Sequence, residues 1–168
     1  MEALVVTGEG LGRSRGGLST KIHLATDGRG LPMSVVLTGG HAGDNPQLLS
    51  VLEGIRVGRV GPGRPRTRPQ AVVADKAYSH PSTRREMRRR KLRFVSPERV
   101  DQTTRRAAKG SRGGRPPAFD QDVYRGRNVI ERCFNRLKQF RGLATRYAKR
   151  AAYYRAEVLI VAIILWLR

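Results

Sequence analysis

Two apolar runs near the start of the sequence are separated by turn residues. The first run extends from Gly17 to Thr26 and the second from Leu31 to Thr38, and the second is rich in β-branched side chains. The residues between them, Asp27 to Gly30, have the composition of a tight turn. This pattern predicts two strands that pair as an antiparallel hairpin.

A later segment repeats apolar side chains at the period of an α-helix, and another is continuously apolar. Asn45 to Ile55 has leucine and isoleucine three or four residues apart, and Asn45 is expected to cap this helix. Ala151 to Leu167 is predicted as the last helix. Its continuous apolar part, Val158 to Leu167, has ten residues, too few to span a bilayer. We therefore expect a buried helix there and no membrane partner.

Two more helices are predicted from charged segments. Pro81 to Lys91 is predicted as a short basic helix, with Thr83 and Glu86 spaced as a capping box. Asp122 can cap a long helix that extends from Val123 to Phe140.

Short apolar runs predict the remaining strands. Ala71 to Ala74 is continuously apolar, which is typical of a strand buried on both faces, and Leu92 to Val95 is a second candidate. Segments 56–70 and 96–121 are rich in Gly, Pro and Arg and are predicted as basic loops. The order of these elements predicts a mixed α/β fold around a central sheet, in a single domain covering 1–168.

The charge of the chain indicates its partner. Lys and Arg number 34 against 13 Asp and Glu, which gives a formal net charge of +21. A body so charged binds polyanions, and nucleic acid is the usual one because neutralised phosphates release counterions. The single cysteine, Cys133, excludes an internal disulfide and favours a reducing compartment. Met1 to Gly10 is neither basic nor strongly apolar, so a signal peptide is not expected there.

One stripe of the predicted helix from Val123 to Phe140 carries polar side chains. At about 100° per residue, Tyr124, Arg127 and Lys138 fall within about 40° of Glu131, and Asn135 lies beside this stripe. Such a stripe is unusual for a buried helix and is available to a ligand. The simpler interpretation is that Glu131 is an exposed ion-pair partner of Arg127.

Asp75 directly follows the strand predicted at Ala71 to Ala74. Sheets of α/β proteins place ligand-binding groups at this end of a strand. A carboxylate there and another on a flanking helix can share divalent metal ions, since Mg²⁺ prefers oxygen ligands. The simpler interpretation makes Asp75 a turn former or a helix cap.

These residues also carry a resemblance to a known family. The spacing Tyr124-x₂-Arg127-x₃-Glu131-x₆-Lys138 resembles the Y-R-E-K pattern of the DDE transposases of bacterial insertion sequences. The segment from Ala74 to Tyr78 resembles the one around the second catalytic aspartate of that family. Three further segments are also similar to family positions: Gly12 to His23, Asp27 to Pro32, and Gly40 to Asp44.

The resemblance implies a ribonuclease H-like fold and a metal-dependent transposase that cleaves the ends of an insertion sequence and joins them to target DNA. By this resemblance Asp75 and Glu131 are catalytic carboxylates that hold Mg²⁺ or Mn²⁺. A DNA-binding role is expected for Lys76, Tyr124, Arg127, Asn135 and Lys138. The protein is expected in the bacterial cytoplasm, on the nucleoid.

One feature departs from the family pattern. The family's first catalytic aspartate lies on a first strand upstream of Gly12, and Met1 to Gly10 contains no aspartate. Asp27 is expected in a turn and Asp44 is expected to cap a helix, so neither replaces it. The sheet is therefore expected to lack its first strand. The chain could be the downstream half of a split transposase or a decayed fragment, completed by a second copy or a partner chain.

Two alternatives follow from this departure. The chain could be a non-catalytic transposase remnant that still binds DNA, because it keeps the charge without the first carboxylate. It could also be a basic RNA-binding protein, which its composition allows, although the polar stripe and Asp75 argue against that.

Overall fold

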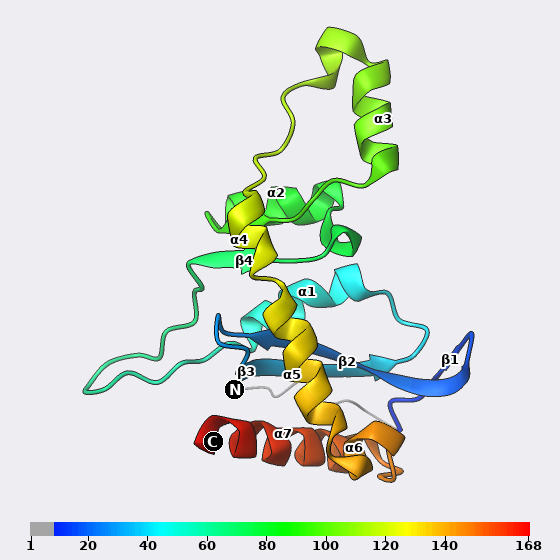
Figure 1. Ribbon diagram of the computed structural model, residues 1–168, viewed down its shortest axis with the longest axis vertical. Helices are drawn as coiled ribbons and strands as arrows, with labels where there is room; N and C mark the ends of the chain where they lie inside the picture. The colour runs from blue at the N-terminus through cyan, green and yellow to red at the C-terminus, as the bar shows by residue number, and fades with distance from the viewer. Residues whose placement is uncertain (1–8) are drawn as a thin grey trace. The chain divides into compact units, whose positions relative to one another are not determined.

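The computed structural model describes residues 9–168, which form two compact units (Figure 1). The first unit joins the described residues up to Thr67 to Asn128–Arg168, and the second is Arg68–Arg127. Both contain strands and helices, so the mixed α/β class is confirmed. The expected central sheet is not seen, because the described strands form separate sheets of three and two strands. That both units act as one catalytic domain stays a prediction.

The sheet of the first unit contains β1 (Gly12–Ser14), β2 (Gly17–Thr26) and β3 (Pro32–Gly39), in that order and antiparallel. The predicted hairpin is thus confirmed. Its turn is fixed by Asp27, whose carboxylate accepts hydrogen bonds from the backbone N–H groups of Arg29 and Leu31 at 2.9 and 2.8 Å. Gly30 has a φ of 84°, a conformation that favours glycine. Strand β1 was not predicted, because three residues of mixed polarity show no periodicity.

Helices cover both faces of the β2–β3 hairpin. Helix α1 (Asp44–Glu53) contacts both strands on one side, and a Cβ built on Gly54, directly after α1, would lie 2.3 Å from Ser34 Oγ. Val35 and Leu37 point to the opposite side, as the alternation of a strand requires, and pack against the later helices. Figure 1 shows α1 and α7 on opposite sides of these strands. Double coverage explains why β3 is mostly buried.

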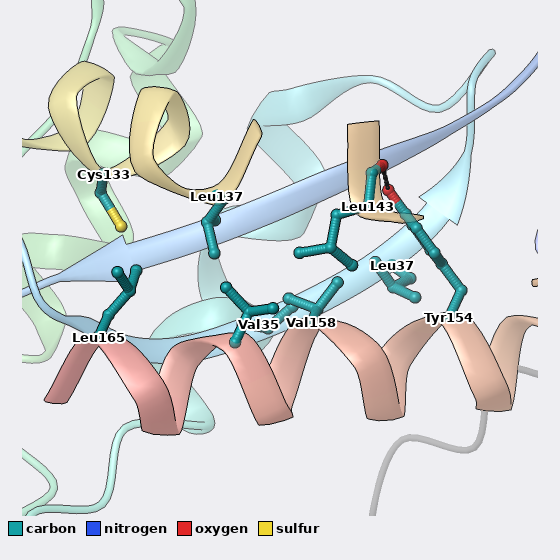
Figure 2. Close-up of a cluster of buried hydrophobic side chains, with 9 residues drawn as sticks. Val35, Leu37, Cys133, Leu137, Leu143, Tyr154, Val158 and Leu165 are labelled. Carbon is teal, nitrogen blue, oxygen red and sulfur yellow. Dashed lines mark hydrogen bonds between the residues drawn. The ribbon is translucent and has the colours of Figure 1, made fainter. Parts of the chain in front are cut away.

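The core of the first unit lies between β3 and the helices α5 (Asn128–Lys138), α6 (Arg141–Thr145) and α7 (Ala151–Leu167). Figure 2 shows α7 presenting one apolar stripe to this core. Its buried residues recur every three or four positions, which is the spacing of one face of a helix. The buried cluster consists of Val35, Leu37, Cys133, Leu137, Leu143, Tyr154, Val158, Val161 and Leu165.

Tyr154 makes the polar contact within this core, because its hydroxyl donates a hydrogen bond to the carbonyl of Leu143 at 2.9 Å (Figure 2). Burial raises the pKa of Tyr154, so the hydroxyl keeps its proton. We expect Tyr154→Phe to lower the free energy of unfolding by about 1–3 kcal/mol, because it leaves a buried carbonyl without a donor. Urea denaturation followed by circular dichroism measures this. Tyr153→Phe, at an exposed position on the same helix, is the control; an equal loss in both variants would contradict the prediction.

The second unit contains a parallel pair of strands, β4 (Ala71–Val73) and β5 (Arg93–Val95). A 3₁₀ turn (Lys76–Tyr78) and helix α2 (Pro81–Arg89) connect them. Both strands and the helix were predicted. A parallel pair needs such a crossover, and it places the residue after β4 at the carboxyl end of the sheet.

Segment 96–121 was predicted as a loop, and this prediction is wrong for its first half. It contains helix α3 (Val100–Ala108) and a 3₁₀ turn (Gly110–Gly113). The helix has no buried residue, so no apolar period reveals it. Gln102 holds its start by accepting a hydrogen bond from the Arg99 N–H, and Arg106 in its last turn forms an ion pair with Glu98, which precedes the helix. Segment 56–70 has no helix or strand, as predicted.

The predicted continuous helix from Val123 to Phe140 is also wrong. The structure has α4 (Gln121–Arg125) and then α5, with an interruption at Gly126 and Arg127. Both interrupting residues donate backbone hydrogen bonds three positions back, to Val123 and Tyr124, which is the tighter 3₁₀ pattern. A single helical phase therefore does not extend from Tyr124 to Glu131.

Three helix starts differ from the caps that the sequence predicted. Gly43 rather than Asn45 precedes α1, Asp120 rather than Asp122 caps α4, and His80 rather than the Thr83–Glu86 pair caps α2. Helices α1 and α4 begin earlier than predicted, and α2 begins at Pro81 as predicted, so each expected capping residue lies inside its helix. Glu86 instead forms ion pairs with Arg89 and Arg90 on its own helix.

No helix within residues 9–168 is long and apolar enough to cross a membrane. The prediction of a missing first strand concerns Met1 to Gly10, of which residues 1–8 lie outside the described part of the chain.

Candidate functional site

Asp75 lies where β4 ends, as the sequence predicts. The strand continues for one residue, because the N–H of Ala74 donates to the carbonyl of Val95 at 3.0 Å. Asp75 then leaves the sheet with extended backbone angles, and its carboxylate accepts a hydrogen bond from the N–H of Lys76. It therefore caps the 3₁₀ turn, as the simpler interpretation holds. A cap uses one carboxylate oxygen, so the two interpretations are compatible.

The electrostatic surroundings of Asp75 are unusual for this chain. The sequence has 34 Lys and Arg, yet within residues 9–168 no cation forms an ion pair with Asp75. The side chain is only half-buried. A carboxylate oxygen in this setting fits the hard oxygen ligands that Mg²⁺ and Mn²⁺ prefer.

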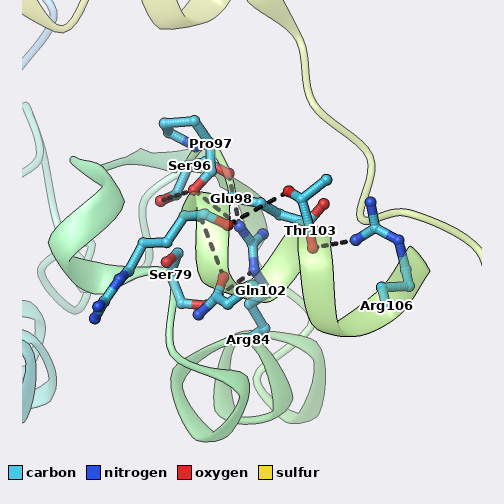
Figure 3. A network of polar contacts seen from close by, with 9 residues as sticks. Ser79, Arg84, Ser96, Pro97, Glu98, Gln102, Thr103 and Arg106 are labelled. Carbon is cyan, nitrogen blue, oxygen red and sulfur yellow. Dashed lines mark hydrogen bonds and ion pairs between the residues drawn. The ribbon is translucent and has the colours of Figure 1, made fainter. Parts of the chain in front are cut away.

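Polar side chains hold the backbone from Asp75 to Ser79, and Figure 3 shows the part of this network around Ser79 and Arg84. The hydroxyl of Ser96 donates to the carbonyl of Asp75 at 2.9 Å. The guanidinium of Arg84 donates to the carbonyls of Ser79, Ser96 and Pro97 at 3.3, 2.7 and 3.4 Å. The side chain of Gln102 donates to the carbonyl of Ser79 as well, at 3.2 Å. Segment 75–79 is thus fastened at its beginning and at its end.

Arg84 is the central member of this network. It is 9% exposed, and its guanidinium also lies over the ring of Phe94, 5.6 Å from the ring centre. Burial lowers the pKa of Arg84, while the nearby carboxylate of Glu98 raises it. Sequence reasoning did not select Arg84, because it lies among other arginines of a predicted basic helix.

Glu131 lies on the exposed face of α5, together with Asn135 and Lys138. Their spacing of four and seven residues places them on one side, while Cys133 and Leu137 face the core. Helix α5 is fastened to the hairpin by Arg136, whose guanidinium donates to the carbonyl of Gly30. The three residues of the predicted stripe that lie on α5 therefore belong to a helix that packs firmly against the core.

Tyr124 and Arg127 lie in and next to α4. The guanidinium of Arg127 lies over the Tyr124 ring, 5.7 Å from its centre, and the same ring contacts Phe119. Asp75, Lys76, Tyr124 and Arg127 belong to the second unit. Glu131, Asn135 and Lys138 belong to the first unit.

The other two aspartates considered from the sequence have structural partners. Burial raises the pKa of Asp27, but hydrogen bonds from the Leu31 backbone and from Arg29 outweigh it and lower the pKa. Asp44 was predicted as a helix cap, which is wrong. It lies in the first turn of α1 and pairs with Lys21 at 3.2 Å. Neither is a candidate metal ligand on this evidence.

Among the described residues, no group of three or more His, Cys, Asp or Glu side chains is gathered closely enough to form a metal site. The candidate ligands are therefore individual carboxylates, Asp75 in one unit and Glu131 in the other. Cys133 is buried, which raises the pKa of its thiol, and it packs in the core.

Comparison with known proteins decides the family. The family model for the transposase DDE domain matches residues 6–167, almost the whole chain. The chain belongs to the transposase DDE domain family. The matched stretch includes all seven candidate site residues, and the resemblance seen in the sequence is confirmed.

Two curated relatives of this transposase domain come from insertion sequences. A protein of Brucella ovis, named provisionally as the transposase of element IS6501, is 30% identical over 151 residues, which cover 90% of this chain and 100% of the relative. A Burkholderia cepacia protein, named in the same way for element IS402, is 34% identical over 132 residues, 79% of this chain. The match spans 55% of that relative's own length. No solved structure matches the chain.

Proposed function

We propose that this chain is a catalytic domain of a bacterial insertion-sequence transposase, in which Asp75 and Glu131 hold divalent metal ions for DNA cleavage and strand transfer. The observation that carries the proposal is Asp75 itself. It follows a parallel strand and is braced by buried hydrogen bonds, yet it has no cation partner among the described residues of a chain with net charge +21. A purely structural aspartate in so basic a protein would be expected to attract an arginine.

Mg²⁺ or Mn²⁺, when bound, would stabilise the attacking and leaving oxygens of an in-line displacement at phosphorus. The chain's own residues would place the DNA. Lys76 is exposed beside Asp75, and Lys138 is exposed on the same face of α5 as Glu131, so each can contact a phosphate. Arg127, whose guanidinium lies over the Tyr124 ring, offers a cation, and Asn135 offers an amide.

A ribonuclease H-like architecture for the whole domain is part of this proposal. It is supported by the presence of antiparallel pairing in one unit and parallel pairing with a helical crossover in the other. That the two units act as a single catalytic domain over 1–168 is proposed with it.

The proposed site also requires a third carboxylate, the family's first catalytic aspartate. Met1 to Gly10 contains no aspartate, and Asp27 and Asp44 have structural partners. We therefore expect the 168 residues alone to cleave DNA weakly, and a second copy or a partner chain to supply the missing group. The competing proposal is a non-catalytic remnant that binds DNA through its charge, and an RNA-binding role is a more distant third.

The test is nicking of a supercoiled plasmid that carries candidate terminal repeats, with Mg²⁺ or Mn²⁺ and with a chelator as control. We expect slow nicking that needs the metal, together with salt-sensitive binding of terminal-repeat DNA. Binding without any nicking would favour the remnant. Tighter binding to RNA than to terminal-repeat DNA would contradict both DNA proposals.

A further inference from the structure

An exposed ribbon rich in arginine follows α1 in the first unit. We define it as residues 57–66. Its base is closed by an antiparallel bridge, in which Val57 and Arg66 exchange two backbone hydrogen bonds of 2.9 and 2.8 Å. All residues from 58 to 65 are exposed, and the relative exposure of Val60 is 110%, so nothing packs against its side chain. The ribbon is therefore a defined projection whose tip has no role in the core.

The tip of the ribbon is slender because of its sequence. Pro62 stands between Gly61 and Gly63, whose φ angles are 102° and 136°. Side chains at these two positions would be strained, so glycine is needed there. A Cβ added at Gly58 or Gly61 would meet no atom within 4 Å. The tip therefore has little bulk and open space around it.

All charged residues in and around the ribbon are arginines. Between Glu53 and Asp75 the chain has five arginines, no lysine and no carboxylate. Arg59 and Arg64 are exposed, and within residues 9–168 neither has an ion-pair or hydrogen-bond partner. The guanidinium is planar and less strongly hydrated than the ammonium group of lysine, so it enters narrow sites at lower cost.

We propose that the 57–66 ribbon binds in the minor groove of A·T-rich duplex DNA, with Arg59 and Arg64 inserted into the groove. The minor groove is only about 6 Å wide, which suits a backbone of Gly and Pro. It is narrowest in A-tracts, where its negative potential is strongest and attracts arginine. Arms that read this groove use arginine in this way. The inference rests on the proposed function only in taking DNA as the ligand.

The second unit contains one tripeptide of the ribbon again, without the closing bridge. Residues 63–65 and 114–116 share the tripeptide Gly-Arg-Pro, and all six residues are exposed. Gly114 also has a positive φ, of 71°. In the part of the chain that the structure describes, only in the ribbon is this tripeptide accompanied by both a second exposed arginine and a closed base.

Ordinary phosphate contact is the rival explanation for an arginine ribbon, and it predicts no preference among duplexes. Fluorescence anisotropy of the full chain would compare three duplexes of equal length: A·T-rich, G·C-rich and inosine·cytosine. The last resembles A·T in the minor groove and G·C in the major groove. We expect the affinity of the chain for the A·T and inosine·cytosine duplexes to be higher than its affinity for the G·C duplex by about fivefold or more.

The decisive variant is Arg59→Lys/Arg64→Lys, which keeps both charges. We expect it to lose the A·T preference while keeping the salt dependence of binding. Arg105→Lys/Arg112→Lys, at exposed positions in and after α3, is the matched control and is expected to keep the preference. Circular dichroism checks that each variant stays folded.

Equal affinity for all three duplexes would overturn the inference, and so would an A·T preference that survives in the Arg59→Lys/Arg64→Lys variant. These outcomes are separate from the nicking assay. A chain that prefers A·T duplexes but never nicks supports the ribbon and contradicts the catalytic proposal. A chain that nicks DNA without any groove preference supports the catalytic proposal and contradicts the ribbon inference.

Discussion

Glu131→Gln and Asp75→Asn are each expected to reduce metal-dependent nicking by about 10³-fold or more. Metal ions contribute several kcal/mol to stabilising charge in such a transition state, and each 1.4 kcal/mol corresponds to about a tenfold change in rate. Both substitutions keep the shape of the side chain and remove its charge. Binding to terminal-repeat DNA should persist, because the net charge becomes more positive by one. Nicking under single-turnover conditions, at several Mn²⁺ concentrations, measures the effect.

The matched control is Asp122→Asn, which removes an exposed carboxylate whose partner is Arg125, three residues away at 3.0 Å. It is expected to nick at the parent rate. The two site variants should also unfold at nearly the same urea concentration as the parent, since Glu131 is exposed and asparagine can still cap at position 75. If either site variant nicks as fast as Asp122→Asn, the assignment of that carboxylate is wrong.

The parts of the fold that the sequence predicted are those with local causes. The hairpin depends on Asp27, whose own side chain holds the turn, and on the apolar residues of β3. Strand β4 and helix α7 are marked by continuous apolar segments. Asp75 could be selected as a candidate because it directly follows one of these segments. In each case a few neighbouring residues contain the physical reason for the structure.

The wrong predictions concern segments whose structure depends on residues elsewhere in the chain, or whose regular pattern is interrupted by a single residue. Helix α3 buries no residue, so its sequence has no apolar period to find. The break before α5 is at Gly126, a glycine inside a helical pattern, and the regular spacing of polar residues obscured it. The spacing of Tyr124, Arg127, Glu131 and Lys138 identified the family correctly although it does not describe one continuous helix.

Arg84 shows why burial is difficult to predict from a basic segment. In the sequence it is one of several arginines in α2, and a solvated helix face is the ordinary expectation for such a run. Its acceptors are carbonyls 5 residues before it and 12 and 13 residues after it, on either side of α2. The carbonyls of Ser96 and Pro97 come close to Arg84 in space only when β4 and β5 pair. The role of Arg84 in holding Ser79 and Ser96 could thus be recognised only from the structure.

Arg84→Met is expected to lower the free energy of unfolding by about 2–5 kcal/mol, because the carbonyls of Ser79, Ser96 and Pro97 would lose a charged donor and remain in the interior. Methionine fills much of the same volume, so the loss reports hydrogen bonding more than packing. Arg84→Lys should recover only part of it, since a single ammonium group cannot reproduce the geometry of the planar guanidinium. Urea denaturation followed by circular dichroism measures both.

Arg85→Met is the control for this prediction, because Arg85 is the exposed neighbour on the same helix and its replacement should change stability by less than about 0.5 kcal/mol. If Arg84 positions Asp75, nicking by Arg84→Lys should also need more Mn²⁺ than the parent does, at a temperature where both are fully folded. A loss of stability with an unchanged Mn²⁺ requirement would limit Arg84 to a structural role. Equal stability of Arg84→Met and Arg85→Met would show that the buried network does not hold the segment from Asp75 to Ser79.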